Sequence, residues 1–113
     1  MPEPLLARRL RRLPVVTALG LEVRLASGPR ARLLGLAHLD REEAGPGLLI
    51  PRCSSVHTFG MRFGLDLYFL DERGEVIAVH RGVPPRRLAF CGQAKAVLEL
   101  PAEKGGEIAT VTP

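Results

Sequence analysis

The sequence has 113 residues, 46% hydrophobic and 25% charged, which is the balance of an ordinary globular domain. This composition excludes an intrinsically disordered chain, and no apolar run is long enough for a transmembrane helix because charged residues, Pro or Gly interrupt each one. The formal net charge is +4, but residues 1–14 carry most of it, so residues 15–113 lack the positive excess that phosphate binding usually requires.

The charge distribution predicts a basic tail at residues 1–14 and a single compact domain at residues 15–113. Leu10 and Leu13 lie near helical spacing with the other leucines of the tail, so the tail is either a short amphipathic helix or unstructured. It has an arginine cluster but no continuous apolar stretch of the kind found in secretory signals. We therefore expect a cytoplasmic protein in which Cys53 and Cys91 are thiols and are not paired.

In the first half of the chain, residues 19–25 alternate apolar and polar side chains, which predicts a half-buried strand. Ser27 then fits a helix N-cap and Pro29 the first helical turn, so we expect a short helix that continues through Leu39. Residues 40–47 are predicted to form a loop.

The second half contains the clearest strand patterns. The run GLLI at residues 47–50 predicts a strand, and LDLYFL, DERG and EVIAVHRGV predict a β-hairpin in which Asp71 opens the turn and Gly74 adopts a left-handed conformation. After a loop at residues 84–93, AKAVLEL and EIATV predict two more strands. The fold class is therefore mainly β, a small antiparallel β barrel or sandwich with one or two short helices.

The segments RARLLGLAHL, CSSVHTFGMRFGLDLYFLDERGEV and AVLELPAEKGG, in this order and spacing, resemble the prokaryotic family known as domain of unknown function 192. The resemblance spans about residues 15–105. It implies a compact, mainly antiparallel β domain with short helices, and it implies no established activity. Many relatives carry Trp-Met-Lys-Asn at the positions of Gly60 to Phe63 in this chain.

Cys53 and His57 are the first candidate site residues, because a thiol and an imidazole can bind a soft metal ion. If this segment is extended, positions four apart are separated by about 13 Å along the strand and cannot share a metal ion. Cys91, His80 or Asp66 would also have to complete the ligand set. We therefore predict no metal site and no cofactor.

A nucleophilic role would make Cys53 or Cys91 the thiolate, His57 the base and Asp66 the residue that orients the base. No Gly-rich turn or helix start follows Cys53 to stabilise a developing negative charge. The catalytic constellation is thus incomplete, and the sequence favours a protein that is not an enzyme.

Asp66 interrupts a strand that is apolar on both faces, so its carboxylate should be partly buried and paired with His57, Arg62 or backbone amides. The alternative is that Asp66 forms the rim of a pocket. Phe59 and Met61 belong either to the core or to the apolar lining of such a pocket.

Arg81, Arg86 and Arg87 flank two prolines in a predicted loop, where they can remain solvated or grip an anion. The function that the sequence favours is a noncatalytic binding or accessory module for a small anionic ligand or a protein partner. Its candidate ligand-binding residues are Cys53, His57, Phe59, Met61, Asp66, Arg81, Arg86 and Arg87. The alternatives are a thiol- or metal-dependent enzyme using Cys53, His57, Asp66 and Cys91, and a weak nucleic-acid contact through the basic tail; neither a membrane partner nor a particular oligomeric state is predicted.

Overall fold

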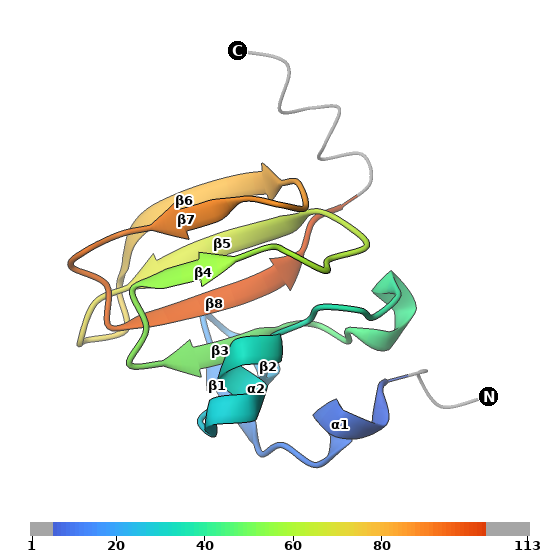
Figure 1. The fold of residues 1–113 in the computed structure, drawn as a ribbon. Coiled ribbons are helices and arrows are strands. Elements are labelled where there is room, and N and C mark those ends of the chain that lie inside the picture. Colours follow the sequence, from blue (N-terminus) through green and yellow to red (C-terminus); the bar gives the residue numbers. More distant parts are fainter. Residues whose placement is uncertain (1–5, 104–113) are drawn as a thin grey trace.

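The structure, a computed structural model, describes residues 6–103 and forms a six-stranded sheet with a small second sheet packed on one face (Figure 1). The helical elements are α1 (Arg8–Arg11), α2 (Pro29–Leu34) and the 3₁₀ turn η1 (Arg41–Glu43). The strands are β1 (Val15–Ala18), β2 (Leu21–Leu25), β3 (Leu48–Pro51), β4 (Ser55–His57), β5 (Leu65–Leu70), β6 (Val76–Val83), β7 (Leu88–Phe90) and β8 (Ala96–Pro101).

The strand order of the large sheet is β1-β2-β3-β8-β5-β6, and β4 pairs with β7 in the small sheet. All strand pairs are antiparallel except β2 with β3, which is parallel. The predicted mainly β class with short helices is therefore confirmed. The large sheet is mixed, however, and ends at β1 and β6 without closing into a barrel.

The β5–β6 hairpin forms as predicted. Asp71 accepts hydrogen bonds on Oδ1 from the backbone amides of Arg73 and Glu75, each at 2.9 Å, and Gly74 has a φ of 81°. A positive φ costs little conformational free energy at this position because glycine has no Cβ. The strands predicted from GLLI and AKAVLEL are likewise present as β3 and β8, whereas the EIATV segment lies outside the described residues.

The strand predicted at residues 19–25 is instead the second half of a hairpin. Leu19 and Gly20 have φ values of 51° and 79° and form the tight turn between β1 and β2. Consecutive positive φ angles are typical of the turns that suit twisted antiparallel strands. The prediction was therefore wrong at its start, because Leu19 belongs to the turn and only Leu21–Leu25 pairs as a strand.

The predicted helix begins and ends earlier than the sequence suggested. Gly28, and not Ser27, is the N-cap residue; Pro29 opens α2, and the helix ends at Leu34 because Gly35 takes a φ of 52°. The expected helical turn at residues 35–39 is an irregular segment that buries Leu36 in the core. The short strand β7 also lies within the predicted loop at residues 84–93.

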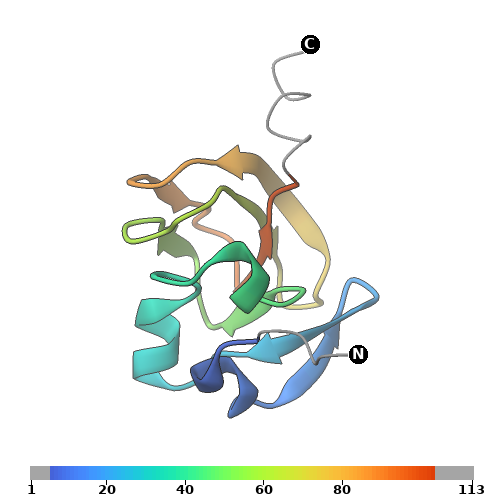
Figure 2. The same ribbon diagram turned by 90° about the vertical axis from the view of Figure 1, so that its right-hand side faces the viewer.

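The main core lies between the large sheet and the layer formed by α2 and the β4–β7 pair, which cover the same face (Figure 2). Side chains of β3, β5 and β8 on this face are almost fully buried, including Leu48, Leu67 and Val97. Leu10 of α1 is also buried there, so the described part of the predicted tail is a short helix that contributes to the core. In residues 6–103 no helix is both long and apolar enough to cross a membrane.

Candidate functional site

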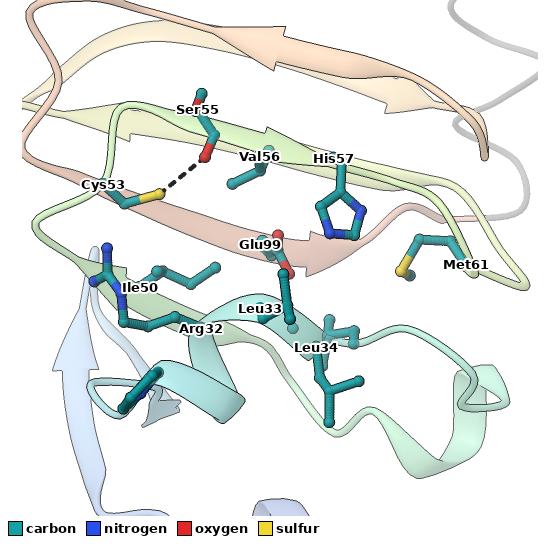
Figure 3. A pocket seen from close by; sticks show the side chains of 13 residues that line it. Arg32, Leu33, Leu34, Ile50, Cys53, Ser55, Val56, His57, Met61 and Glu99 are labelled. Carbon is teal, nitrogen blue, oxygen red and sulfur yellow. Dashed lines mark hydrogen bonds between the residues drawn. The ribbon is translucent and has the colours of Figure 1, made fainter.

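A cavity of about 360 Å³ opens between α2, the β3–β4 segment and β8 (Figure 3). Its apolar lining consists of Pro29, Leu33, Leu34, Leu36, Ile50, Val56 and Met61. Its polar lining consists of Arg32, Cys53, Ser55, His57 and Glu99. Leu33 is 69% exposed whereas Glu99 is 3% exposed, so Leu33 lies at the mouth and Glu99 at the floor.

Glu99 lies at the centre of the large sheet. In the register of β8 it stands opposite Leu48 of β3 and Leu67 of β5, both of which are fully buried. Cross-strand partners project on the same face of a sheet, so the carboxyl group points into the main core. Its Oε1 atom is buried and has no hydrogen-bond partner among the described residues. A buried polar atom without a partner is rare and costly in folded proteins.

Burial changes the acidity of this carboxyl group. Removing it from water disfavours the charged form and raises the pKa of Glu99 from 4.5 to about 7. At neutral pH the group therefore exchanges readily between a neutral acid and a carboxylate. A strongly shifted carboxyl group in a cavity is a frequent property of binding and catalytic sites.

The wall of the cavity next to Glu99 is Gly35. A Cβ atom at this position would lie 3.1 Å from Glu99 Oε1, so the carboxyl group packs directly against the glycine backbone. On the other side, the Arg9 guanidinium donates hydrogen bonds to the Gly35 carbonyl at 3.0 Å and to the Ala37 carbonyl at 2.6 Å. The segment after α2 is thus held in place by a side chain from the N-terminal part of the chain.

Cys53 and His57, which the sequence singled out, both line this cavity. The Cys53 thiol donates to the Ser55 carbonyl at 3.1 Å, and burial is the main cause of a raised pKa for this thiol. His57 Nδ1 accepts a hydrogen bond from the Phe59 amide at 3.2 Å, which leaves the proton of a neutral ring on Nε2. Cys53 is therefore held as a thiol, and His57 keeps one N–H free to donate.

Arg32 is the basic side chain among the lining residues, but its guanidinium is engaged elsewhere. It donates to the carbonyls of Pro51 and Arg52, at the end of β3. The Arg32 guanidinium is consequently held near Cys53 (Figure 3). Among the described residues, it does not donate a hydrogen bond to Glu99 Oε1.

Asp66 belongs to a different region. Its Oδ1 accepts a hydrogen bond from the Gly82 amide at 2.8 Å, and its Oδ2 lies 3.9 Å from the Arg81 guanidinium. The predicted pairing of Asp66 with a backbone amide is therefore confirmed, while Arg62 pairs with Asp40. Arg81 also stacks over the Tyr68 ring at 5.6 Å.

The remaining predicted residues are spread over the surface. Met61 is 8% exposed and lines the cavity, but Phe59 is 51% exposed and does not. Arg86 and Arg87 are exposed between β6 and β7, and Cys91 follows β7 outside the cavity. The structure thus brings together Cys53, His57 and Met61.

The described part of the chain contains no group of three His, Cys, Asp or Glu side chains that lie close enough together to hold a metal ion. Both cysteines are free thiols. The cavity therefore offers hydrogen-bonding groups around an unpaired carboxyl group, and not a coordination sphere.

Sequence analysis missed Glu99, although a signal was present. In AVLEL, Val97 and Glu99 fall on one face of the strand and Leu98 and Leu100 on the other, so an apolar residue flanks the acid on either side. Like Asp66, Glu99 is a carboxylate in a strand that is apolar on both faces, and such a group is expected to be partly buried. The sequence could not show that Glu99 has no partner, because that depends on the fold.

The comparisons with known proteins agree with this architecture. The model of the DUF192 family, described as "Uncharacterized ACR", matches residues 15–110. None of the curated proteins matches the chain. A similar solved structure is a "putative transcription regulator" from Sinorhizobium meliloti 1021, with a TM-score of 0.63, 23% identity and coverage of 86% of this chain and 81% of that one. Another is a protein of unknown function from Novosphingobium aromaticivorans DSM 12444, with a TM-score of 0.58, 19% identity and coverage of 84% and 76%.

Proposed function

This chain belongs to the uncharacterised DUF192 family, and we propose that it is a noncatalytic binding module whose small-molecule site is the cavity above Glu99. The observation that carries the proposal is Glu99, a residue that lines the cavity and whose buried Oε1 atom has no hydrogen-bond partner among residues 6–103. A ligand that donates a hydrogen bond to the Glu99 carboxyl group offsets the cost of burying this polar group without a partner.

The shape and lining of the cavity support a small ligand. Its volume of about 360 Å³ lies within the range of small-molecule sites, which combine mostly apolar walls with a few polar groups. Ile50, Val56 and Met61 supply apolar surface, while Ser55, His57 and Glu99 supply hydrogen-bonding groups. This division favours a compact organic molecule with one polar end.

Binding is favoured over thiol catalysis by the state of Cys53. Nucleophilic cysteines have a lowered pKa, whereas burial raises that of Cys53 and its proton is donated to the Ser55 carbonyl. Asp66 and Cys91, which a thiol enzyme was expected to use, do not line the cavity. Among residues 6–103, no acidic side chain hydrogen-bonds to the His57 ring to orient it, as an acid does in activated pairs of this kind.

The proposal is tested with a fragment library and the ¹³C-labelled methionine methyl groups of the protein. The chain has 2 methionines, and Met61 lines the cavity, so its methyl resonance reports on occupation. Leu33→Trp places a bulky side chain at the exposed mouth and should abolish the shifts, whereas Leu88→Trp, at a residue that is 79% exposed and outside the cavity, should preserve them. Fragment shifts that survive Leu33→Trp, or no shift with any fragment, would contradict the proposal.

Nucleic-acid contact through the N-terminal segment is a second candidate. Arg8, Arg11 and Arg12 are exposed on or beside α1, and such an arrangement can contact phosphates. The description of the Sinorhizobium meliloti relative as a "putative transcription regulator" supports testing this function. Arg81, Arg86 and Arg87 are exposed, and we propose them as the residues that would contact the predicted small anionic ligand or protein partner.

A further inference from the structure

We infer that the ligand of the Glu99 cavity is a small aliphatic amine, whose ammonium group binds the Glu99 carboxylate while its hydrocarbon part lies against Ile50, Val56 and Met61. This inference rests on the proposed function and adds the chemical class of the ligand.

The charge of the Glu99 carboxyl group favours a cationic ligand. No ion pair to Glu99 forms within residues 6–103, and the nearby Arg32 guanidinium is held by the carbonyls of Pro51 and Arg52. The cavity therefore has an acidic floor that no cation of the described residues balances. A bound ammonium group supplies both the missing charge and the missing donor, and charge-assisted hydrogen bonds are stronger than neutral ones.

Carboxylate and alcohol ligands suit the Glu99 carboxyl group less well than an ammonium ion does. A carboxylate ligand would place a second negative charge against Glu99 in a site of low polarity, which is unfavourable. A neutral alcohol can donate one hydrogen bond but leaves the charge unbalanced whenever Glu99 ionises. An ammonium group has three donors, so it can donate to Glu99 and still have donors left for other polar groups that line the cavity.

The apolar lining of the cavity restricts the chemistry of the rest of the ligand. The rest of the lining is dominated by aliphatic side chains and Met61, so it accommodates a hydrocarbon group better than a second polar group. A polyamine or an amino acid would carry a further charged group into this apolar surface. The structure therefore favours a monoamine with a branched or cyclic hydrocarbon part.

Binding of such an amine is coupled to the protonation of Glu99. The other titratable or charged groups facing the cavity are Cys53 and His57 from the β4 side and Arg32 from α2. Because the empty site holds Glu99 partly protonated, an ammonium ion displaces that proton on binding. Affinity should increase about fivefold between pH 6 and pH 7, with release of protons to the buffer.

The experiment uses cyclohexylmethylamine, cyclohexylmethanol and cyclohexanecarboxylate as probes of matched shape. Binding is followed by the Met61 methyl resonance and by calorimetry in two buffers of different ionisation enthalpy. We expect the amine to bind at least about tenfold more tightly than the alcohol at pH 7.5, and the carboxylate to bind most weakly. Glu99→Gln should remove the preference for the amine and the proton release, while Glu75→Gln, at an exposed acid, should change neither.

Each outcome decides the inference. Equal binding of amine and alcohol that is insensitive to Glu99→Gln would overturn the amine assignment and leave the cavity as a binding site. Tighter binding of the carboxylate would overturn it in favour of an anion. If none of the probes binds, the amine assignment fails, and the proposed function is then decided separately by the fragment library. If Glu99→Gln does not fold, the proton release of the unmodified protein still decides the question.

Discussion

Gly35 packs against Glu99 so closely that a methyl group on its Cα would stand 3.1 Å from the Oε1 atom and 3.6 Å from Oε2. Gly35 also has a φ of 52°, which side-chain-bearing residues adopt at a cost. This one residue therefore ends α2 and leaves space for the carboxyl group at the floor of the cavity.

Gly35→Ala should lower the free energy of unfolding by about 2–3 kcal/mol, because backbone strain and the contact with Glu99 add together. Gly74→Ala is the matched control, since Gly74 also has a positive φ but nothing lies within 4 Å of the added methyl group. Urea denaturation measures both. The cost of Gly35→Ala should fall in a Glu99→Ala background, and an unchanged cost would show that the carboxyl contact contributes nothing.

Stability should decrease with increasing pH because of Glu99. The pKa of this group is 4.5 when exposed and about 7 in the folded protein, so the folded state binds more protons in this interval and ionisation favours unfolding. The stabilising effect of a low pH is complete below about pH 4.5 and is lost as pH rises through about 7, a change on the order of 3 kcal/mol. Urea unfolding of the protein and of Glu99→Gln over pH 4.5–8 measures this difference. Parallel curves for the two proteins would contradict it.

Replacement of the carboxyl group by an apolar side chain should stabilise the protein. Glu99→Met keeps a similar volume, removes the unpaired Oε1 and extends the apolar surface formed with Leu48 and Leu67. We expect a gain of about 1–3 kcal/mol in unfolding free energy at pH 8. The same variant should no longer distinguish amine from alcohol. A loss of stability at pH 8 would mean that Glu99 has a partner in solution.

Cys53 should react slowly with iodoacetamide at pH 7. Burial is the largest effect and raises the pKa of the thiol, the backbone hydrogen bond at Ser55 and the Arg32 guanidinium lower it, and the Glu99 carboxylate raises it. In a Cys91→Ser background, the midpoint of the pH profile of Cys53 alkylation should lie at a higher pH than that of a free thiol. In the Glu99→Gln variant, this midpoint should move to a lower pH. Rapid alkylation at pH 7 would instead support the thiol-enzyme alternative.

If the N-terminal arginines contact nucleic acid, binding of duplex DNA should weaken steeply with salt. Replacing Arg8, Arg11 and Arg12 by Gln should then reduce the slope of log K against log salt by about 0.9 for each lost phosphate contact. Replacing Arg52, Arg73 and Lys95 by Gln changes the net charge equally at other exposed positions. Fluorescence anisotropy measures both variants, and an equal effect of the two would assign binding to general charge and not to α1.

The sequence predicted the parts of this structure that local chemistry determines. Asp71 and Gly74 specify the β5–β6 turn, and the apolar run of β5 indicated that Asp66 needs a partner. Helix α2 was predicted too long because the helical pattern continues past Gly35, whose conformation depends on the packing around it.

The site could be predicted only in part. Cys53 and His57 stood out as chemical groups, but the position of Glu99 opposite Leu48 and Leu67 depends on the pairing of β8 with β3 and β5, which are distant in sequence. Whether a buried acid has a partner is likewise a property of the assembled core. The strand β7 was missed because its short apolar run follows two prolines and resembles a loop.

The hydrogen bonds from Arg9 to the carbonyls of Gly35 and Ala37 have a practical consequence for how the protein can be divided. A chain shortened to begin at Val15 would lose both bonds and the buried Leu10. Arg9, which holds the backbone beside Glu99 in place like a brace, would then be missing. Deletion of the first 14 residues is therefore not a neutral way to study charge at the N-terminus. Point substitutions of the exposed arginines leave the brace intact and separate the two roles of this short segment.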